Sequence, residues 1–390
     1  MPTDTIMTHH WTALADGRIQ CDVCPRECKL GPGQRGLCFV RARPDAAAVS
    51  GPADDGATKD GIVLTTYGRS SGFCIDPIEK KPLNHFLPGT PVLSFGTAGC
   101  NLACSFCQNW DISKSRQMDT LAGRATPYTL AVAAKQSGAR AVAFTYNDPV
   151  IFLEYAIDVA AACRQLGIKT VAVTAGYINP PARAEFYRWM DAANIDLKAF
   201  TEDFYWSITK SHLQPVLDTL LYLKHETQVW FEITNLVIPG VNDSDQEITE
   251  LSRWVARELG PDVPVHFSAF HPDYKMRDRP RTPPATLVRA REIAQGEGLR
   301  YVYVGNVHDP ARASTYCHGC GSLVMARDWY QLGRWGLDEA GVCTTCGTPC
   351  AGVFDGPPGQ WGRARKPIQF GQQVKIQGTA PALPSGQPVS

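Results

Sequence analysis

Residues 99–110 read GCNLACSFCQNW and place three cysteines close together, with the spacing Cys100-x3-Cys104-x2-Cys107. A structural zinc ion is normally held by four protein ligands. A 4Fe–4S cluster has one iron at each corner, so three thiolates can hold three irons and leave the fourth open to a small ligand. The spacing therefore predicts an open iron–sulfur site, with a partial zinc site or buried structural thiols as the alternatives.

Strand and helix patterns alternate on the C-terminal side of this motif. Short runs of apolar, β-branched and aromatic residues predict strands, and the runs are 92–99, 141–146, 169–176, 193–200, 229–238, 263–270 and 300–306. Segments with helical spacing lie between them at 149–167, 243–260 and 284–298. Such alternation predicts an α/β protein with a parallel sheet and right-handed crossovers. Six or seven units fit an open doubly wound sheet or a full or partial barrel.

Polar residues gather where the predicted strands end. They are Thr145, Tyr146 and Asn147, the pairs Asp196 and Lys198, Glu232 and Thr234, and His266 and Ser268, and finally Asn306 and His308. Residues two apart on a strand share a face. In parallel α/β folds the site lies at the carboxyl ends of the strands. The repetition on successive strands favours one shared pocket over separate surface polar residues.

Composition limits the class of protein. The 390 residues contain 38 Lys and Arg and 38 Asp and Glu, so no overall charge draws the chain toward nucleic acid or an anionic membrane. Hydrophobic residues make up 44% of the chain, which is enough for a sizeable core. We see no apolar run of about 20 residues and no signal-peptide core at the N-terminus. We therefore expect a cytoplasmic protein without a membrane span, for which nucleic acid is a less favoured partner.

Twelve of the 14 cysteines fall into three clusters, which favours metal binding over disulfides in a reducing compartment. Cys21, Cys24, Cys28 and Cys38 fit either a closed zinc site or an auxiliary iron–sulfur cluster, with zinc preferred. Cys317, Cys320, Cys343 and Cys346 form two C-x2-C knuckles typical of a zinc ribbon, with Cys350 as a spare thiol. A structural role for this ribbon is favoured over nucleic-acid or protein binding.

Several further stretches carry a family resemblance. They are EKKPLNHFLPG, GCNLACSFCQN, FTYNDP, NIDLKAF, LVIPGVND, VHFSAFHPDYK and YVYVGN. The C-x3-C-x2-C motif, with Phe106 before its last cysteine, resembles the signature of radical S-adenosylmethionine (SAM) enzymes. The whole set is similar to the AmmeMemoRadiSam-system radical SAM enzyme, a group similar to pyruvate formate-lyase activating enzymes. The resemblance covers roughly residues 18–354.

The resemblance implies a fold and a domain division. The fold is a radical SAM partial TIM-type (β/α)6 barrel with a Cys-rich N-terminal segment and a C-terminal zinc-ribbon-like module. We expect the N-terminal segment over 1–90, the radical SAM core over 91–306, the module over 307–355 and a Pro- and Gly-rich disordered tail over 356–390.

The resemblance also implies cofactors and the residues that hold them. SAM is expected at the open iron, where one-electron reduction gives methionine and a 5′-deoxyadenosyl radical that takes a hydrogen atom from a substrate. Asp196 and Lys198 match a D-x-K that contacts the methionine and ribose parts of SAM, and His266 matches a ribose contact. Phe106 can stack on a planar base or shield the cluster.

One stretch departs from the family pattern. Most members bind the methionine amine with a G-G-E-type stretch, where this chain has TYNDP, residues 145–149. Thr145, Asn147 and Asp148 each offer an oxygen acceptor there, and Asp148 stands where the subgroup usually has Glu.

Three functions are compatible with these features. The first is a radical SAM enzyme with an unidentified substrate, for which a protein is one candidate, and a low-potential electron donor such as flavodoxin or ferredoxin. The second is an activase that places a glycyl radical on a partner enzyme. The third is an iron–sulfur or zinc scaffold that binds protein or RNA and makes no radical. The intact cysteine motif, D-x-K and His266 favour the enzymes.

Overall fold

The computed structural model describes residues 4–45, 60–115, 121 and 123–370. Its centre is a nine-stranded sheet in the order β16-β15-β14-β13-β12-β11-β9-β8-β20. Seven of these strands are parallel: β9 (Pro91–Phe95), β11 (Ala141–Phe144), β12 (Lys169–Thr174), β13 (Ala192–Asp196), β14 (Trp230–Val237), β15 (Val265–Ala269) and β16 (Val302–Gly305). Each lies within or overlaps a strand predicted from the sequence, which confirms the mostly parallel α/β fold.

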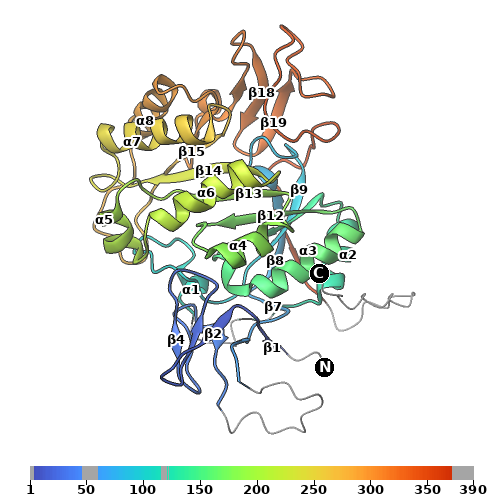
Figure 1. Ribbon diagram of the computed structural model, residues 1–390. Helices are drawn as coiled ribbons and strands as arrows, with labels where there is room; N and C mark the ends of the chain where they lie inside the picture. Colours follow the sequence, from blue (N-terminus) through green and yellow to red (C-terminus); the bar gives the residue numbers. More distant parts are fainter. Residues whose placement is uncertain (1–3, 46–59, 116–120, 122, 371–390) are drawn as a thin grey trace.

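Helices connect the parallel strands and cover the sheet (Figure 1). They are α2 (Pro127–Gln136), α3 (Leu153–Gln165), α4 (Pro180–Tyr187), α6 (Gln214–Glu226), α7 (Asp245–Trp254) and α8 (Pro284–Gly296). The predicted helices match α3, α7 and α8. Helix α7 begins where the Ser244 side chain accepts a hydrogen bond from the Glu247 amide, and its π-helical extension to Leu259 ends at Gly260, whose φ of +93° suits glycine.

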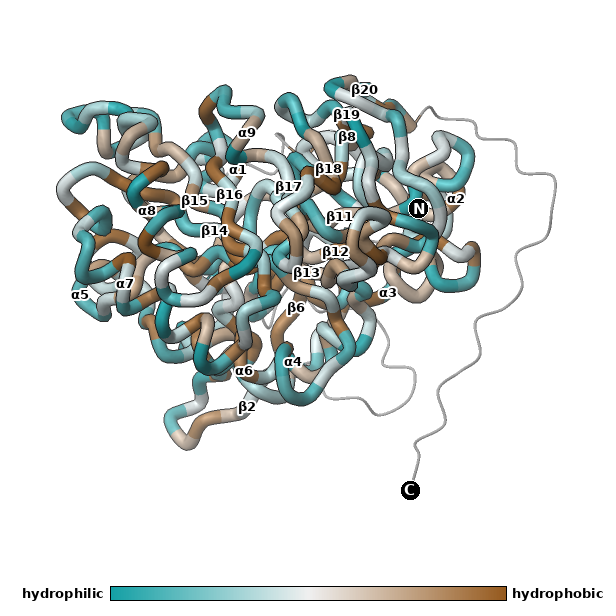
Figure 2. The backbone as a smooth tube through the Cα atoms, turned by 90° about the horizontal axis from the view of Figure 1, so that it is seen from above, coloured by the Kyte–Doolittle hydropathy of each residue, from teal (hydrophilic) through white to brown (hydrophobic). Residues whose placement is uncertain are grey.

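The core lies on both faces of the parallel strands. All four residues of β11 and the first four of β13 are buried, as is usual where helices cover both faces of a sheet. Figure 2 shows hydrophobic segments along the central strands and hydrophilic ones at the outer turns. In the described part of the chain, no helix is both long and apolar enough to cross a membrane.

Two antiparallel strands extend the sheet beyond β9. They are β8 (Phe73–Pro77) and β20 (Lys366–Ile368), which pair with each other. The prediction of a disordered tail from residue 356 is therefore wrong for residues 366–368, which form β20 because β8 offers an open edge. Phe370 also packs edge-on against Phe73, with 4.8 Å between the ring centroids. The rest of the predicted tail, residues 371–390, lies outside the described residues. The N-terminal boundary also differs, because β8 places residues 73–77 in the core sheet.

Short sheets flank the core at opposite ends (Figure 1). The N-terminal strands are β1 (Ile6–Met7), β2 (Trp11–Ala13), β3 (Ile19–Cys21), β4 (Lys29–Leu30), β5 (Arg41–Ala42), β6 (Val63–Leu64) and β7 (Arg69–Ser70), the last of which pairs with β10 (Gly123–Arg124). The C-terminal module has β17 (Thr315–Tyr316), β18 (Leu323–Asp328) and β19 (Gln331–Trp335). Short helices α1 (Trp110–Ser113), α5 (Glu202–Phe204) and α9 (Pro310–Ala313) complete the described fold.

The C-terminal module contacts both β16 and the connection between β8 and β9. Thr315 of β17 is hydrogen-bonded to Tyr303 of β16, 2.7 Å apart. Arg327 of β18 donates to the carbonyl of Asn84, which follows β8, at 2.6 Å. The strand order itself runs open from β16 to β20, and its seven parallel strands are one more than a six-unit barrel has.

Candidate active site

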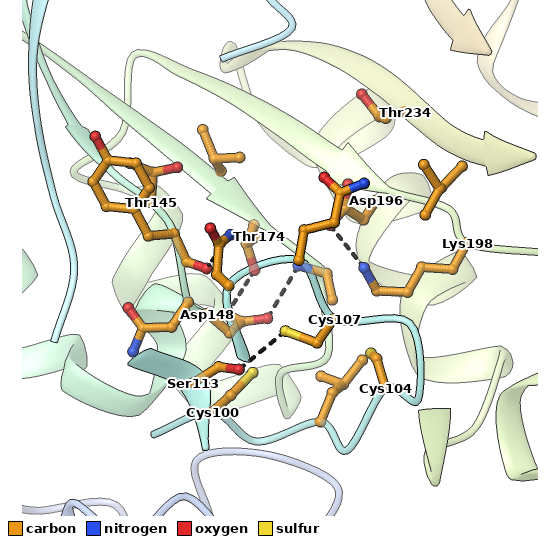
Figure 3. Close-up of a pocket in the computed structure, with 18 of the residues that line it drawn as sticks. Cys100, Cys104, Cys107, Ser113, Thr145, Asp148, Thr174, Asp196, Lys198 and Thr234 are labelled. Atoms are coloured by element: carbon orange, nitrogen blue, oxygen red, sulfur yellow. Dashed lines mark hydrogen bonds and ion pairs between the residues drawn. The ribbon is translucent and has the colours of Figure 1, made fainter. Parts of the chain in front are cut away.

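The three motif cysteines leave the carboxyl end of β9 and line one side of a cavity of 280 Å³ (Figure 3). The loop turns at Gly99, whose φ is +84° and where a Cβ atom would lie 1.9 Å from the carbonyl oxygen of Cys38. Gly96 is equally constrained, because a Cβ there would lie 2.3 Å from the carbonyl of Thr145. Glycine is therefore required at both positions by close backbone approach.

Neighbouring elements fix the cysteine loop in place. The Asn147 side chain accepts from the Thr97 amide at 3.1 Å and donates to the Gly99 carbonyl at 2.7 Å. Within the loop, the amide of Ala103 donates to the Thr209 carbonyl at 2.9 Å. Lys114 Nζ donates to the Leu102 carbonyl at 2.7 Å. Hydrogen bonds to neighbouring elements therefore hold the cysteine loop at several points along its length.

Two of the three thiols, those of Cys100 and Cys104, are poor acids in this setting. Burial raises the pKa of Cys104 to about 12, and it also raises the pKa of Cys100. Cys107 Sγ lies 3.0 Å from the hydroxyl oxygen of Ser113 at the end of α1. Thiolates are the metal-binding form, so a metal has to displace these protons as it binds.

Asp196 and Lys198 form the opposite wall of the cavity (Figure 3). Lys198 Nζ lies 2.8 Å from Asp196 Oδ2. Burial alone would lower the pKa of Lys198, but the Asp196 carboxylate and the Cys104 sulfur raise it, and the net shift is upward. The Phe106 ring lies beneath this ammonium, with its centroid 5.7 Å from Nζ, and packs against Phe204. The cation is therefore held facing the cysteine loop.

The stretch TYNDP forms a third side of the cavity. Its polar side chains have different hydrogen-bond partners. Asp148 accepts from the Thr174 hydroxyl at 2.8 Å and from the Ala175 amide at 3.0 Å. Burial raises the Asp148 pKa, opposed by these two bonds. Asn147 is occupied by the cysteine loop. In the part of the chain that the structure describes, the Thr145 hydroxyl makes no hydrogen bond, so it remains available to a ligand.

His266 lies in a second chamber rather than among the residues that line the first cavity. This chamber has a volume of 120 Å³ and shares Pro82, Ser268 and Asn306 with the cavity. His266 Nε2 lies 2.7 Å from Glu232 Oε2, and Glu232 Oε1 also accepts from the His85 amide at 2.7 Å. The histidine thus belongs to a buried polar pair, and its role as a ribose contact stays a prediction.

Comparisons with known proteins agree with this geometry. The radical SAM superfamily model matches residues 95–252. An uncharacterised protein of Methanocaldococcus jannaschii is 37% identical over 336 residues, which cover 86% of this chain and 95% of that relative. The chain belongs to the radical SAM superfamily.

Two more distant similarities are to pyruvate formate-lyase-activating enzymes. The pyruvate formate-lyase-activating enzyme of Clostridium pasteurianum is 26% identical over 199 residues, which cover 46% of this chain and 80% of that enzyme. A domain of the pyruvate-formate lyase-activating enzyme from Bacteroides vulgatus superposes with a TM-score of 0.38 and 19% identity, over 43% of this chain and 99% of that domain.

The residues present fit the cofactors of a radical SAM enzyme, which are a 4Fe–4S cluster and SAM. Three cysteines share one wall and leave the rest of the cavity to a ligand. The remaining lining offers a carboxylate, an ammonium and hydroxyls, which match the amine, carboxylate and ribose hydroxyls of SAM. Ser113 and Thr174 also line the cavity. The sequence carried no signal for these two, because only the fold brings them beside the cysteine loop.

The C-terminal cysteines form a compact group at the far end of the molecule. The sulfurs of Cys317, Cys320, Cys343 and Cys346 all lie within 4.8 Å of one another. Hydrogen bonding with Ser322 lowers the pKa of Cys320 to about 6, which favours the thiolate. These four can hold a metal ion, as predicted, whereas Cys350 lies outside the group. Cys21, Cys24, Cys28 and Cys38 line a different, smaller cavity beside the motif loop.

Proposed function

We propose that this protein cleaves SAM reductively at a 4Fe–4S cluster held by Cys100, Cys104 and Cys107. The observation that carries the proposal is one cavity with three cysteines on one wall and the Asp196–Lys198 pair on another. When bound, the cluster and SAM supply a one-electron cleavage of the sulfonium C–S bond, which gives methionine and a 5′-deoxyadenosyl radical able to remove hydrogen from a substrate.

The side chains around the cavity orient SAM. Lys198 offers a fixed positive charge to the methionine carboxylate, and Asp196 offers carboxylate oxygens to the ribose hydroxyls. Thr145 is the favoured acceptor for the methionine amine, because Asn147 and Asp148 already bond the backbone. Phe106 provides an apolar face beside the last cysteine. Together these residues hold the ligand in one orientation, and orientation is the main contribution of a protein to cofactor chemistry.

The adjoining chamber is the proposed position of the hydrogen donor. It shares Pro82, Ser268 and Asn306 with the SAM cavity and is also lined by Arg327, Trp329 and Tyr330 of the C-terminal module. A substrate there would lie against the cavity in which the radical forms. The module would then contribute to the substrate site as well as to the fold.

Two finer assignments rest on similarity alone. The sequence motifs favour membership of the AmmeMemoRadiSam group. Similarity to pyruvate formate-lyase activating enzymes favours a second candidate function, in which the hydrogen donor is a glycine of a partner protein. Both functions need a low-potential electron donor of the flavodoxin or ferredoxin kind. A scaffold without radical chemistry would have no need for the Asp196–Lys198 pair facing the cysteines.

The test uses extracts of cells grown in D2O, separated into protein and small-molecule fractions. The anaerobically reconstituted enzyme is given SAM, a reductant and one fraction, and 5′-deoxyadenosine is analysed by mass spectrometry. We expect deuterium in this product with one fraction and none with the matched unlabelled fraction. Label from the protein fraction together with a glycyl-radical EPR signal would favour the activase. Formation of no 5′-deoxyadenosine with any fraction would contradict the proposed function.

A further inference from the structure

The N-terminal cysteines line a small closed cavity. Cys21 ends β3, and its amide donates to the Cys28 carbonyl at 3.0 Å across the hairpin with β4. Gly36 brings the next loop close, since a Cβ there would lie 3.5 Å from Cys28 Sγ. Cys24 and Cys38 complete the lining of a space of 20 Å³. The four cysteines thus line one small cavity.

Sulfur spacing separates two kinds of cysteine site. A single zinc ion with Zn–S bonds of about 2.3 Å places its tetrahedral sulfurs about 3.8 Å apart. The C-terminal group meets this requirement, with Cys317 and Cys346 sulfurs 3.5 Å apart and Cys320 and Cys343 sulfurs 3.8 Å apart. An iron–sulfur cluster distributes its cysteines over several irons, so their sulfurs stand farther apart than around one ion.

The N-terminal group has the wider arrangement. Among the described residues, no three sulfurs of Cys21, Cys24, Cys28 and Cys38 all lie within 4.8 Å of one another. The sulfurs of the three motif cysteines, Cys100, Cys104 and Cys107, do not all lie within 4.8 Å of one another either. By spacing, the N-terminal group resembles the motif cysteines and differs from the C-terminal group.

The surroundings also suit a cluster. The Leu37 amide donates to Cys28 Sγ at 3.5 Å, and hydrogen bonds to sulfur are one means by which proteins tune such clusters. Arg41 lines the same cavity and forms a buried ion pair with Glu154. The motif loop is the next neighbour: Arg26 Nε donates to the Asn101 carbonyl at 2.8 Å, and Asn101 lines the cavity.

We propose that Cys21, Cys24, Cys28 and Cys38 hold an auxiliary iron–sulfur cluster beside the SAM-binding cluster, and that the C-terminal four hold zinc. The sequence preferred zinc at the N-terminal site, because C-x2-C spacing serves both metals and only the folded arrangement of the sulfurs distinguishes them. The proposal goes beyond the proposed function, since the N-terminal cysteines lie outside the SAM cavity.

The decisive variant removes the motif cluster and leaves the N-terminal site untouched. The full chain with Cys100→Ala, Cys104→Ala and Cys107→Ala is purified anaerobically, and its iron, acid-labile sulfide and zinc are measured. We expect ~2 to ~4 iron atoms per chain with equal sulfide, and ~1 zinc. Absence of iron, with or without a second zinc ion, would overturn the proposal.

Two further measurements keep the test open if the triple variant does not fold. In the wild-type protein, Mössbauer spectra should show more iron than one 4Fe–4S cluster holds, whereas iron limited to ~4 per chain would overturn the proposal. A double variant with Cys24→Ala and Cys28→Ala should lose the additional iron and keep the iron of the motif cluster. Cys163→Ala, at a buried cysteine outside the clusters, is the matched control and should keep all of it.

Discussion

At the scale of single residues, the proposed binding of SAM depends most on the Asp196–Lys198 pair. The two side chains share a face of the chain at the end of β13 and bond to each other at 2.8 Å. The Cys104 sulfur is a second neighbour of Lys198 and adds to the rise of the Lys198 pKa. The strand pattern alone predicted the shared face, but the approach of the cysteine loop to this face required the fold.

Asp196→Asn should weaken SAM binding and leave the motif cluster intact. Losing a hydrogen bond to a charged group costs roughly 1.5–3 kcal/mol, or about a tenfold to hundredfold loss of affinity. Equilibrium binding under anaerobic conditions measures the effect. Asp262→Asn is the control, because it also breaks an aspartate ion pair, with Arg300, but does not line the cavity. Equal affinity in Asp196→Asn and wild type would remove the pair from the SAM site.

Glu79, in the wall of the second chamber, should make stability depend on pH. Burial raises the pKa of Glu79 to about 7 from its ordinary value of 4.5, although nearby Arg327 opposes the shift. Between these two values the folded protein retains a proton that the unfolded chain has released. The contribution of Glu79 to stability should therefore be fully present below about pH 4.5 and be lost as pH rises through about 7, by roughly 3 kcal/mol.

Glu79→Gln should remove this dependence, since the amide stays neutral and its oxygen can still accept from the Gly89 amide. Denaturant unfolding at about pH 5.5 and about pH 8 measures the difference. An identical fall in wild type and variant would show that Glu79 is not the titrating group.

At the scale of elements, the positions of the parallel strands were accessible from sequence because such strands are buried on both faces and read as apolar runs. Strand β20 was not accessible, since three residues, KPI, pair only because β8 offers an edge. The partner of His266 was also hidden, because Glu232 reaches it from the neighbouring strand β14. Local patterns thus predicted elements, while pairings between distant residues needed the structure.

Asn147→Ala should loosen the cysteine loop. The variant loses both side-chain bonds to residues 97–99 and leaves buried backbone groups unpaired, at a cost of roughly 1–3 kcal/mol each. We expect less iron per chain after purification and faster loss of iron to a chelator. Thr145→Ala, at a neighbouring position without a bond to the loop, is the control. Wild-type iron retention by Asn147→Ala would mean that the loop is held by its other anchors.

At the scale of the whole molecule, the C-terminal module matters because it links β16 to the connection between β8 and β9. Arg327 links it to Asn84, and Thr315 links it to Tyr303. The metal knuckles were predicted from their spacing, but this bridging position was not, because it depends on contacts between residues more than 200 positions apart, as with Arg327 and Asn84.

Cys320→Ala with Cys346→Ala should remove zinc, leave iron unchanged and lower the unfolding temperature of the full chain. Structural zinc in small modules contributes on the order of 10 kcal/mol, which is folding free energy. Metal analysis and calorimetry measure the two effects, with Cys350→Ala as the control that keeps zinc. Unchanged zinc content in the double variant would contradict the assignment of the site.

SAM cleavage at the three motif cysteines is tested most directly by comparing three anaerobically reconstituted proteins. These are the wild type, Cys104→Ala and Cys163→Ala. Methionine and 5′-deoxyadenosine are counted per chain after addition of SAM and a reductant. We expect equal amounts of the two products from wild type and Cys163→Ala, and neither product from Cys104→Ala. Undiminished cleavage by Cys104→Ala would show that the chemistry does not take place at these three cysteines.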